Sequence, residues 1–305
     1  MAAGSRGPRQ SLVVYGEQAW VADRLILRTA LGKHDHVRPL KDGSIQSDRL
    51  RLELVEFDPL PKAFRHMVRG GDLDVSEMAL TTHLLAHHFR KPLTALPLPL
   101  WRRLHHANLV CASGSTIAGP KDLEGKKVGV RAYSQTTGVW IRGILASQYG
   151  VDLSKITWVT MEDAHVAEYQ DPPGVVRYAG GKPLRDLLLS GELAAIMGER
   201  DVDPNNVRTV IADADAAAET WSRETRIFPV NHVVSVRTEL LRSHPWLGDE
   251  LMRIFEAARV RSGVRTPPYG LEPNRAPMQM LLDFAASQRL TPRTYRVDEL
   301  FPKAA

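Results

Sequence analysis

The stretch KKVGVRAYSQTTGVWIRGIL, residues Lys126–Leu145, contains the local pattern that decides the fold. Lys126–Val130 is a short run rich in valine and predicts a strand. A turn of small polar residues follows, and an apolar pattern with helical spacing predicts a helix over Gly138–Tyr149 that begins near Thr136. A strand that leads through a short turn into a helix is the repeating unit of α/β proteins.

The same alternation extends from this unit toward both ends of the chain. Further strands are predicted at Leu25–Leu31, Leu50–Val55, Leu73–Val75, Leu93–Pro97, Asn108–Ala112, Ile156–Val159, Ala194–Met197, Val207–Ile211 and Val230–Val236. Further helices are predicted at Lys62–Val68, Met78–His88, Leu184–Leu189, Trp246–Arg261 and Arg275–Arg289. The sequence therefore predicts an α/β fold with largely parallel sheets that are covered by helices.

Two segments divide this pattern into lobes. CASGSTIAGPKD (Cys111–Asp122) is rich in Gly, Ser and Pro, and Glu224–Phe228 precedes Pro229. We expect residues 23–110 and 230–305 to form lobe one, 111–229 to form lobe two, and 1–22 to be an N-terminal extension. A chain that leaves one lobe, builds a second and returns predicts a cleft between them, where ligands commonly bind.

Composition narrows the functional class. Of the 305 residues 43% are apolar and 25% are charged, as in ordinary globular proteins. No apolar run is long enough to span a membrane, the first twenty residues do not read as a secretory signal, and the single Cys111 suits a reducing compartment. We therefore expect a cytoplasmic protein without a membrane partner.

The net charge of +5 is compatible with a small anionic ligand. The arginines are scattered and no nucleic-acid-binding motif is present, so no nucleic-acid partner is predicted. A homo-oligomer is compatible with the sequence. The motifs of serine hydrolases, of HExxH zinc enzymes and of P-loop proteins are absent from the sequence, which disfavours those classes.

Polar residues follow the first predicted strand in HDHVR, His34–Arg38. Ligands of α/β proteins bind beyond the carboxyl ends of strands, so His34, Asp35, His36 and Arg38 could bind an anion or transfer protons. A polar surface turn is the alternative. The two histidines lack further ligands at suitable spacing, and no metal site is predicted.

Glu77 lies in DLDVSEMAL, Asp72–Leu80. We expect the short strand to end at Val75, with Ser76 as a helix N-cap. Glu77 would then either complement the dipole of the following helix or lie in the cleft as an acid–base group.

Two more segments carry polar groups to the cleft. Arg131 and the run Ser134–Thr137 stand between a strand and a helix, where hydroxyls, an amide and free backbone N–H groups can hold a carboxylate. An ordinary capped helix is the alternative. His232, in FPVNHVVSV (Phe228–Val236), lies at the return crossing between the lobes, although a single histidine at the start of an apolar strand is commonly structural.

The chain resembles the 4,5-dihydroxyphthalate decarboxylases, which have a type 2 periplasmic-binding-protein fold. The resemblance extends from about Arg24 to Phe301. It is carried by HDHVRPLKDG (His34–Gly43), DVSEMAL (Asp74–Leu80), GPKDLEGKKVGV (Gly119–Val130), QTTGVWIRGIL (Gln135–Leu145), YGVDLSKITWV (Tyr149–Val159), LLSGELAAI (Leu188–Ile196), RETRIFPVNHVV (Arg223–Val234), HPW (His244–Trp246) and PYGLEPNR (Pro268–Arg275).

The chain departs from the family pattern near the expected ligand. Arg131-Ala132-Tyr133-Ser134 stands where the family has Pro-Glu-Trp-Ala, and Asn231 stands in place of a methionine, whereas Trp101, which replaces a serine, is a departure elsewhere in the chain. These changes leave the substrate open between 4,5-dihydroxyphthalate and another aromatic acid. Since the fold also serves solute receptors, a binding protein without chemistry is a further alternative.

The resemblance implies a decarboxylase that uses no cofactor and acts on a small aromatic dicarboxylate. In that chemistry His232 would donate the proton, and Glu77 or Asp35 would accept hydrogen bonds from the phenolic hydroxyls. Arg38, Arg131 and the turn Ser134, Gln135, Thr136 and Thr137 would hold carboxylates. The further binding candidates are His36, Arg102, His106 and Arg200.

Overall fold

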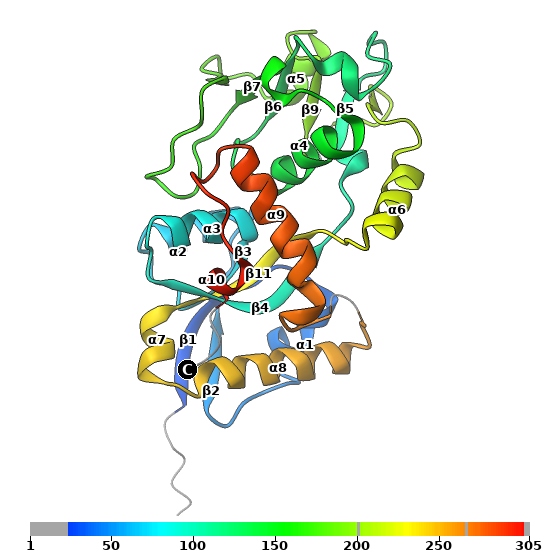
Figure 1. Ribbon diagram of the computed structural model, residues 1–305. Helices are drawn as coiled ribbons and strands as arrows, with labels where there is room; N and C mark the ends of the chain where they lie inside the picture. The colour runs from blue at the N-terminus through cyan, green and yellow to red at the C-terminus, as the bar shows by residue number, and fades with distance from the viewer. Residues whose placement is uncertain (1–23, 200–201, 266–267, 302–305) are drawn as a thin grey trace, which may run out of the picture.

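The computed structural model describes residues 24–199, 202–265 and 268–301. These residues form two mixed β-sheets, and helices cover both faces of each sheet (Figure 1). The expected N-terminal extension over 1–22 and the candidate Arg200 lie outside the described residues. Figure 1 shows the sheet that contains β6, β7 and β9 above the sheet that contains β1, β3 and β11.

The first sheet has the order β2-β1-β3-β11-β4. Its strands are β1 (Leu25–Ala30), β2 (Leu50–Leu54), β3 (Val75–Ala79), β4 (Leu93–Arg102) and β11 (Val230–Arg237). The second sheet has the order β10-β5-β9-β6-β7-β8. Its strands are β5 (Leu109–Ala112), β6 (Lys127–Val130), β7 (Thr157–Thr160), β8 (Val175–Arg177), β9 (Ala195–Met197) and β10 (Val207–Thr209).

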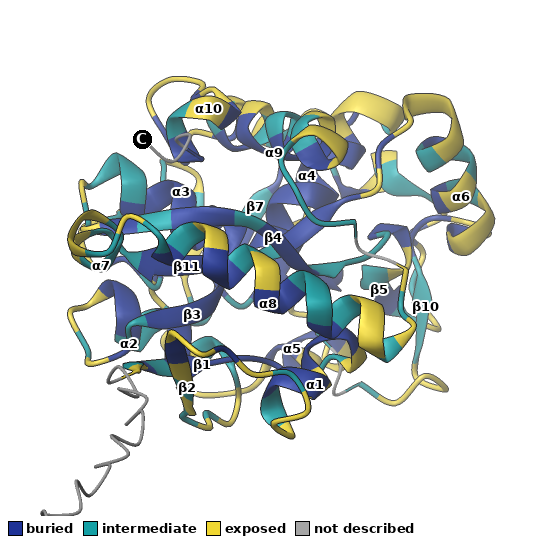
Figure 2. Ribbon diagram, turned by 90° about the horizontal axis from the view of Figure 1, so that it is seen from below, coloured by how far each residue is buried: buried dark blue, intermediate teal, exposed yellow. Residues whose placement is uncertain are grey.

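The helices cover both faces of each sheet. They are α1 (Arg38–Lys41), α2 (Pro61–Val68), α3 (Leu80–His88), α4 (Thr136–Tyr149), α5 (Leu184–Leu189), α6 (Ala214–Thr225), α7 (Thr238–Ser243), α8 (Leu247–Ser262), α9 (Arg275–Ser287) and α10 (Val297–Leu300). Short 3-10 helices span Asp35–Val37, His106–Asn108, Pro120–Leu123, Leu153–Lys155 and Glu272–Asn274. Apolar residues of α8 pack on one face of the first sheet, and those of α2 and α3 pack on the other (Figure 2).

The sheets are less uniformly parallel than the alternation predicts. β1 pairs in parallel with β2 and β3, and β6 pairs in parallel with β7 and β9. β5 and β11 run antiparallel to their neighbours. These are the first strands after each crossing between sheets, so each follows a strand of the other sheet and is not joined to a neighbour by the strand–helix–strand connection that gives a parallel pair.

The chain passes from the first sheet to the second between Arg102 and Leu109, and it returns between α6 and β11. Helix α9, in the C-terminal part of the chain, packs against α4 (Figure 1), and Phe284 contacts Trp140 edge-on at 5.7 Å between ring centroids. A Cβ atom on Gly143 would overlap the Phe284 ring, so only glycine allows this approach. The segment expected in lobe one thus also contacts the helix that follows β6.

The strand that carries Glu77 differs from its prediction. β3 begins at Val75 and extends to Ala79, so Ser76 and Glu77 lie inside the strand, and Ser76 is not a helix N-cap. All five residues of β3 are buried because helices cover both faces of the sheet. A strand buried on both sides lacks the alternation that would distinguish it from a helix in the sequence.

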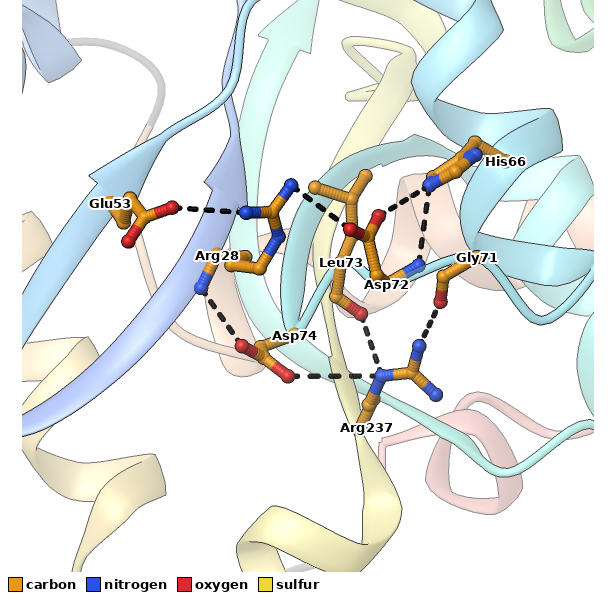
Figure 3. A network of polar contacts seen from close by, with 8 residues as sticks. All are labelled: Arg28, Glu53, His66, Gly71, Asp72, Leu73, Asp74 and Arg237. Atoms are coloured by element: carbon orange, nitrogen blue, oxygen red, sulfur yellow. Dashed lines mark hydrogen bonds and ion pairs between the residues drawn. The ribbon is translucent and has the colours of Figure 1, made fainter.

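A polar network links neighbouring strands of the first sheet (Figure 3). The Arg28 guanidinium lies 3.0 Å from carboxylate oxygens of both Glu53 and Asp72. The Arg28 backbone N–H donates to Asp74 Oδ2 at 2.8 Å, and Arg237 Nε donates to the Leu73 carbonyl at 2.7 Å. These contacts join β1, β2 and β11 to the loop that precedes β3 and thereby fix where β3 begins.

Candidate active site

A cavity of about 660 Å³ lies where the two sheets face each other. Its walls are the segments that follow the carboxyl ends of strands in both sheets, the usual ligand position in α/β proteins. These segments contribute Gly32, Lys33 and His34 after β1, Ala79 at the end of β3, Arg131, Ala132 and Ser134–Thr137 after β6, Glu162 and His165 after β7, and Gly198 and Glu199 after β9.

The inner wall holds a carboxylate between two histidines. Glu77 has no exposed surface, and its Oε1 lies 2.6 Å from His232 Nδ1. His34 Nε2 lies 3.0 Å from both carboxylate oxygens, and the Gly32 backbone N–H donates to Oε2 at 2.8 Å. Both carboxylate oxygens are therefore engaged by protein groups, and Glu77, which lines the inner end of the cavity, holds the two imidazoles in place.

Gly32 allows this close approach after β1. A Cβ atom at this position would lie 2.7 Å from Glu77 Oε2 and 2.7 Å from His34 Nε2. Both distances are shorter than van der Waals contact allows, so any side chain at position 32 would displace the His34–Glu77 pair. The glycine is thus a requirement of the site.

Charge and burial shift the pKa values of Glu77 and His232 in opposite directions. Burial alone would raise the pKa of Glu77, but its hydrogen bonds with His232 and His34 outweigh burial and hold its pKa below the usual range. Burial lowers the pKa of His232, although Glu77 partly offsets it. The free protein therefore holds an ionised Glu77 beside a neutral His232, with His232 Nδ1 engaged and Nε2 available to a ligand.

Aromatic rings fix the position of His232. Phe64 on α2 and Trp101 on β4 contact its imidazole in T-shaped arrangements, with centroid distances of 5.1 and 4.7 Å. Both aromatic residues line the cavity. They provide an apolar surface for a ring-shaped ligand next to the imidazole.

The opposite wall presents hydroxyl and N–H groups at the start of α4. Ser134, Thr136 and Thr137 are buried and line the cavity with Gln135. The first N–H groups of a helix have no partner within the helix and attract anions. Thr81 on α3 donates to the Ser134 carbonyl at 2.7 Å and lies 2.7 Å from Thr136 Oγ1, which joins the two sheets at this point.

Two arginines add positive charge to this wall. Arg131 follows β6, and its Nε lies 3.4 Å from Glu162 Oε1. Arg103, in the crossing between the sheets, donates to Thr137 Oγ1 at 3.1 Å and lies over the Trp101 ring. Glu162 also pairs with Arg65 on α2, so it balances part of the charge that a carboxylate ligand would meet.

The structure brings seven of the predicted site residues to the cavity. These are Glu77, Arg131, Ser134, Gln135, Thr136, Thr137 and His232. Asp35 and Arg38 have side chains that are 78% and 66% exposed, and they do not line the cavity. The short helix over Asp35–Val37 turns His34 inward and these two charged side chains toward solvent.

Three other candidates do not line the cavity. His36 is buried and stacks on His34 at 5.3 Å, and burial together with His34 lowers its pKa to about 4. Arg102 donates to the Phe228 carbonyl, and His106 Nε2 lies 2.8 Å from Gln148 Oε1. Their surroundings support the walls, and we do not place them in contact with a ligand.

The roles assigned from the sequence left out several residues that line the cavity. These are His34, Phe64, Trp101, Arg103, Glu162 and His165. His34 belongs to the HDHVR cluster, in which roles were assigned to Asp35, His36 and Arg38 but not to His34. His165 lies in a segment without regular secondary structure, and no periodic pattern in the sequence indicated where it would lie.

The described residues were compared with the requirements of a metal site and of a membrane-spanning helix. Among them no group of three or more His, Cys, Asp or Glu side chains is arranged to hold a metal ion. In the same ranges no helix is both long and apolar enough to cross a membrane.

Comparison with known proteins assigns the family. A 4,5-dihydroxyphthalate decarboxylase from Comamonas testosteroni is 32% identical to the chain over 249 residues, which are 77% of this chain and 75% of the relative. The chain belongs to the 4,5-dihydroxyphthalate decarboxylase family. A second protein of that name, from Pseudomonas putida, is 28% identical over 219 residues, which are 67% of this chain and 83% of the relative. The resemblance found in the sequence is confirmed, and it relates the chain to enzymes.

No family model matches the chain. Solved structures confirm the predicted periplasmic-binding-protein-like fold of this family member. The aliphatic sulphonate-binding protein SsuA from Escherichia coli has a TM-score of 0.57 at 16% identity and covers 91% of this chain and 97% of its own. The desulfurization enzyme DszB has a TM-score of 0.51 at 14% identity over 92% of this chain and 96% of its own. At these identities the likeness concerns the fold alone.

Proposed function

We propose that the protein is a carboxy-lyase that converts 4,5-dihydroxyphthalate to 3,4-dihydroxybenzoate and CO2. The observation that carries this proposal is the His34–Glu77–His232 cluster, which faces a cationic wall rich in N–H groups across the cavity of a family member. The wall with the His34–Glu77–His232 cluster transfers the proton, and the opposite wall binds the carboxylate.

The chemistry of the substrate explains why both are needed. Direct loss of CO2 would leave an aryl anion in the ring plane, where the π system cannot stabilise it. Protonation of the ring carbon that bears the carboxylate avoids this anion. Electron density from the para hydroxyl supports the protonated, dienone-like intermediate. The C–C bond then breaks, CO2 leaves, and the electron pair of that bond restores the aromatic ring.

His232 is the proposed proton donor. Its Nδ1 is held by Glu77, so Nε2 carries the proton to the ring carbon. Burial keeps His232 neutral in the free protein, but a bound dianion adds its negative charge to that of Glu77 and raises the pKa of the imidazole. Substrate binding thus favours proton uptake by His232 from solvent, and Glu77 stabilises the imidazolium that forms.

The remaining carboxylate has a place on the opposite wall. Arg131 and the first turn of α4 offer a guanidinium, hydroxyls and backbone N–H groups within one cavity wall. These groups bind the carboxylate equally well before and during the reaction. Phe64 and Trp101 contribute an apolar surface for the ring. The overall reaction transfers no net electrons, so the proposal requires no redox cofactor.

The decisive experiment is incubation of the purified protein with 4,5-dihydroxyphthalate, followed by chromatography for 3,4-dihydroxybenzoate and measurement of CO2. In D2O the product should carry one deuterium at the carbon that lost CO2. Tight binding without product would instead support a solute-binding protein. Absence of both binding and product would indicate another aromatic acid, which the arginine at position 131 would then help to explain.

A further inference from the structure

The segment Met161–Tyr169, which we call the strap, extends from β7 of the second sheet onto the helices of the first. Arg65 on α2 contacts Glu162 and the Asp163 carbonyl, both at 3.2 Å. Arg69 donates from Nε to the His165 carbonyl at 2.9 Å and from Nη2 to the Ala164 carbonyl. Lys91, just after α3, pairs with Glu168. Contacts along its length therefore attach the strap to the first sheet's helices.

Two strap residues, Glu162 and His165, line the cavity, and His165 brings an imidazole to it. Its Nδ1 lies 2.9 Å from Thr82 Oγ1 on α3, and the next residue, Val166, is buried in the apolar cluster around Phe64 and Met67. The hydrogen bond with Thr82 and the burial of Val166 thus fix the position of His165. Because Nδ1 is engaged by Thr82, Nε2 is the nitrogen available to a ligand.

The position of His165 relates it to the proton donor. Phe64 contacts His165 at 5.8 Å and His232 at 5.1 Å between ring centroids, in T-shaped geometry in both cases. One phenyl ring therefore supports both imidazoles. A planar aromatic ligand that packs near Phe64 would present its ring substituents to His165 as well as to His232.

The surroundings of His165 keep it uncharged. Burial lowers its pKa to about 3, and the nearby charges of Arg131, Arg65 and Arg69 and of His232 when protonated act in the same direction. A neutral imidazole with one nitrogen engaged offers a single uncharged donor or acceptor, depending on its tautomer. It cannot compete with Arg131 or the start of α4 for a carboxylate.

We propose that His165 is a specificity-determining residue that hydrogen-bonds a ring hydroxyl of the substrate through Nε2. A hydroxyl both donates and accepts, so it matches either tautomer of the imidazole, whereas a carboxylate only accepts. An acid without that hydroxyl leaves a largely buried ring nitrogen unpaired, and sites built around a hydroxyl reject such analogues. This inference rests on the proposed function for the class of ligand.

Calorimetric titration of wild type and His165→Leu with 4,5-dihydroxyphthalate and with phthalate tests the assignment. We expect His165→Leu to weaken binding of the dihydroxylated acid about 5- to 100-fold, the range of one lost hydrogen bond to a buried group. Binding of phthalate, which lacks hydroxyls, should not weaken and should become tighter, because leucine has no ring nitrogen to leave unpaired. His165→Gln, which retains a polar group, should recover part of the loss, and Thr82→Val should show a smaller loss with the same selectivity.

His244→Gln, at a histidine remote from the cavity, is the matched control and should bind both acids as wild type does. Equal losses for both acids in His165→Leu, or no loss for either, would overturn the inference, with circular dichroism showing whether the variant is folded. The proposed function fails in a different way, namely if wild type binds 4,5-dihydroxyphthalate but forms no product. If wild type binds neither acid, both proposals are wrong.

Discussion

His232 Nδ1 lies 2.6 Å from Oε1 of Glu77, and the pairing of two strands sets this distance. β11 runs antiparallel to β3, with His232 opposite Ala79 and Val234 opposite Glu77. Residues two apart on a strand share a face, so His232 and Glu77 are diagonal neighbours on the same face of the sheet. The register therefore brings together two residues that are 155 positions apart in the chain.

The first prediction concerns this pair. Glu77→Gln should retain the fold and lower kcat by a factor on the order of 10² to 10⁴, because an amide neither fixes the imidazole tautomer nor stabilises the imidazolium. Steady-state kinetics with 4,5-dihydroxyphthalate measure the loss, and KM should change far less than kcat. A Glu77→Gln variant with wild-type kcat would remove the His–Glu pair from the mechanism.

The second prediction is the pH dependence of the rate. If protonated His232 is the donor, kcat/KM falls as the pH rises above the pKa of His232 in the free protein, which burial holds below 6.5. The fall in kcat should occur at higher pH, because the bound dianion raises that pKa. In Glu77→Gln both transitions should move to lower pH, since the carboxylate that favours the imidazolium is gone.

Rates measured from pH 5 to 9 provide the check. His232→Gln should lose nearly all turnover while it still binds substrate, as calorimetry can show. A value of kcat/KM that stays constant or rises across this range would contradict His232 as the acid.

The alternation of strands and helices could be predicted from the sequence because each element has its own local pattern. The α4 turn was also predictable, since hydroxyl and amide residues between a strand and a helix lie at a helix N-terminus. The partners of Glu77 were not. They depend on the register of β3 with β11 and on the turn after β1, neither of which any local pattern encodes.

The strap shows a second reason why part of the site could not be predicted from the sequence. It has no periodicity, and its position depends on contacts of Arg65 and Arg69 with backbone carbonyls. Any sequence at those positions presents such carbonyls, so the residues of the strap do not reveal the contact. His165 consequently looked like an ordinary surface histidine until the fold placed it beside Thr82.

The third prediction concerns charge at the cavity. Arg131→Ala should raise KM about 10- to 150-fold with a smaller effect on kcat, because a charge-assisted pair with a carboxylate is worth about 1.5–3 kcal/mol and acts equally in ground and transition states. Glu162→Gln should lower KM, since the substrate no longer competes with Glu162 for Arg131. Arg223→Ala, an exposed arginine on α6, is the control. An unchanged KM in Arg131→Ala would mean that the α4 turn alone binds the carboxylate.

The fourth prediction concerns the network in Figure 3. Asp74→Ala removes the acceptor of the Arg28 backbone N–H and should lower the free energy of unfolding by about 1–3 kcal/mol. Asp72→Ala removes a carboxylate that is 64% exposed and should cost less than about 1 kcal/mol. Urea unfolding of both variants at pH 7.5 compares them. A larger loss for Asp72→Ala would show that the charges of the network, rather than the part-buried hydrogen bond to the Arg28 backbone, hold the strands together.

The fifth prediction concerns stability in acid. His83 is buried on α3 with Nδ1 at 2.9 Å from Ser235 Oγ, and burial lowers its pKa to about 3. Below pH 6.5 the unfolded chain binds a proton at this residue and the folded chain does not. Its contribution to the free energy of unfolding is therefore fully present above pH 6.5 and decreases by about 1.4 kcal/mol for each pH unit below it.

His83→Gln isolates this contribution, because glutamine keeps a polar side chain but does not titrate. Between pH 7.5 and 5.0 the wild-type free energy of unfolding should fall by about 2 kcal/mol more than that of the variant, the value expected for one histidine over the 1.5 units below pH 6.5. The comparison is a difference between two pH values within each protein, so any loss of packing in the variant at neutral pH cancels. Equal pH dependence in both proteins would mean that His83 is protonated in the folded state as readily as in the unfolded chain.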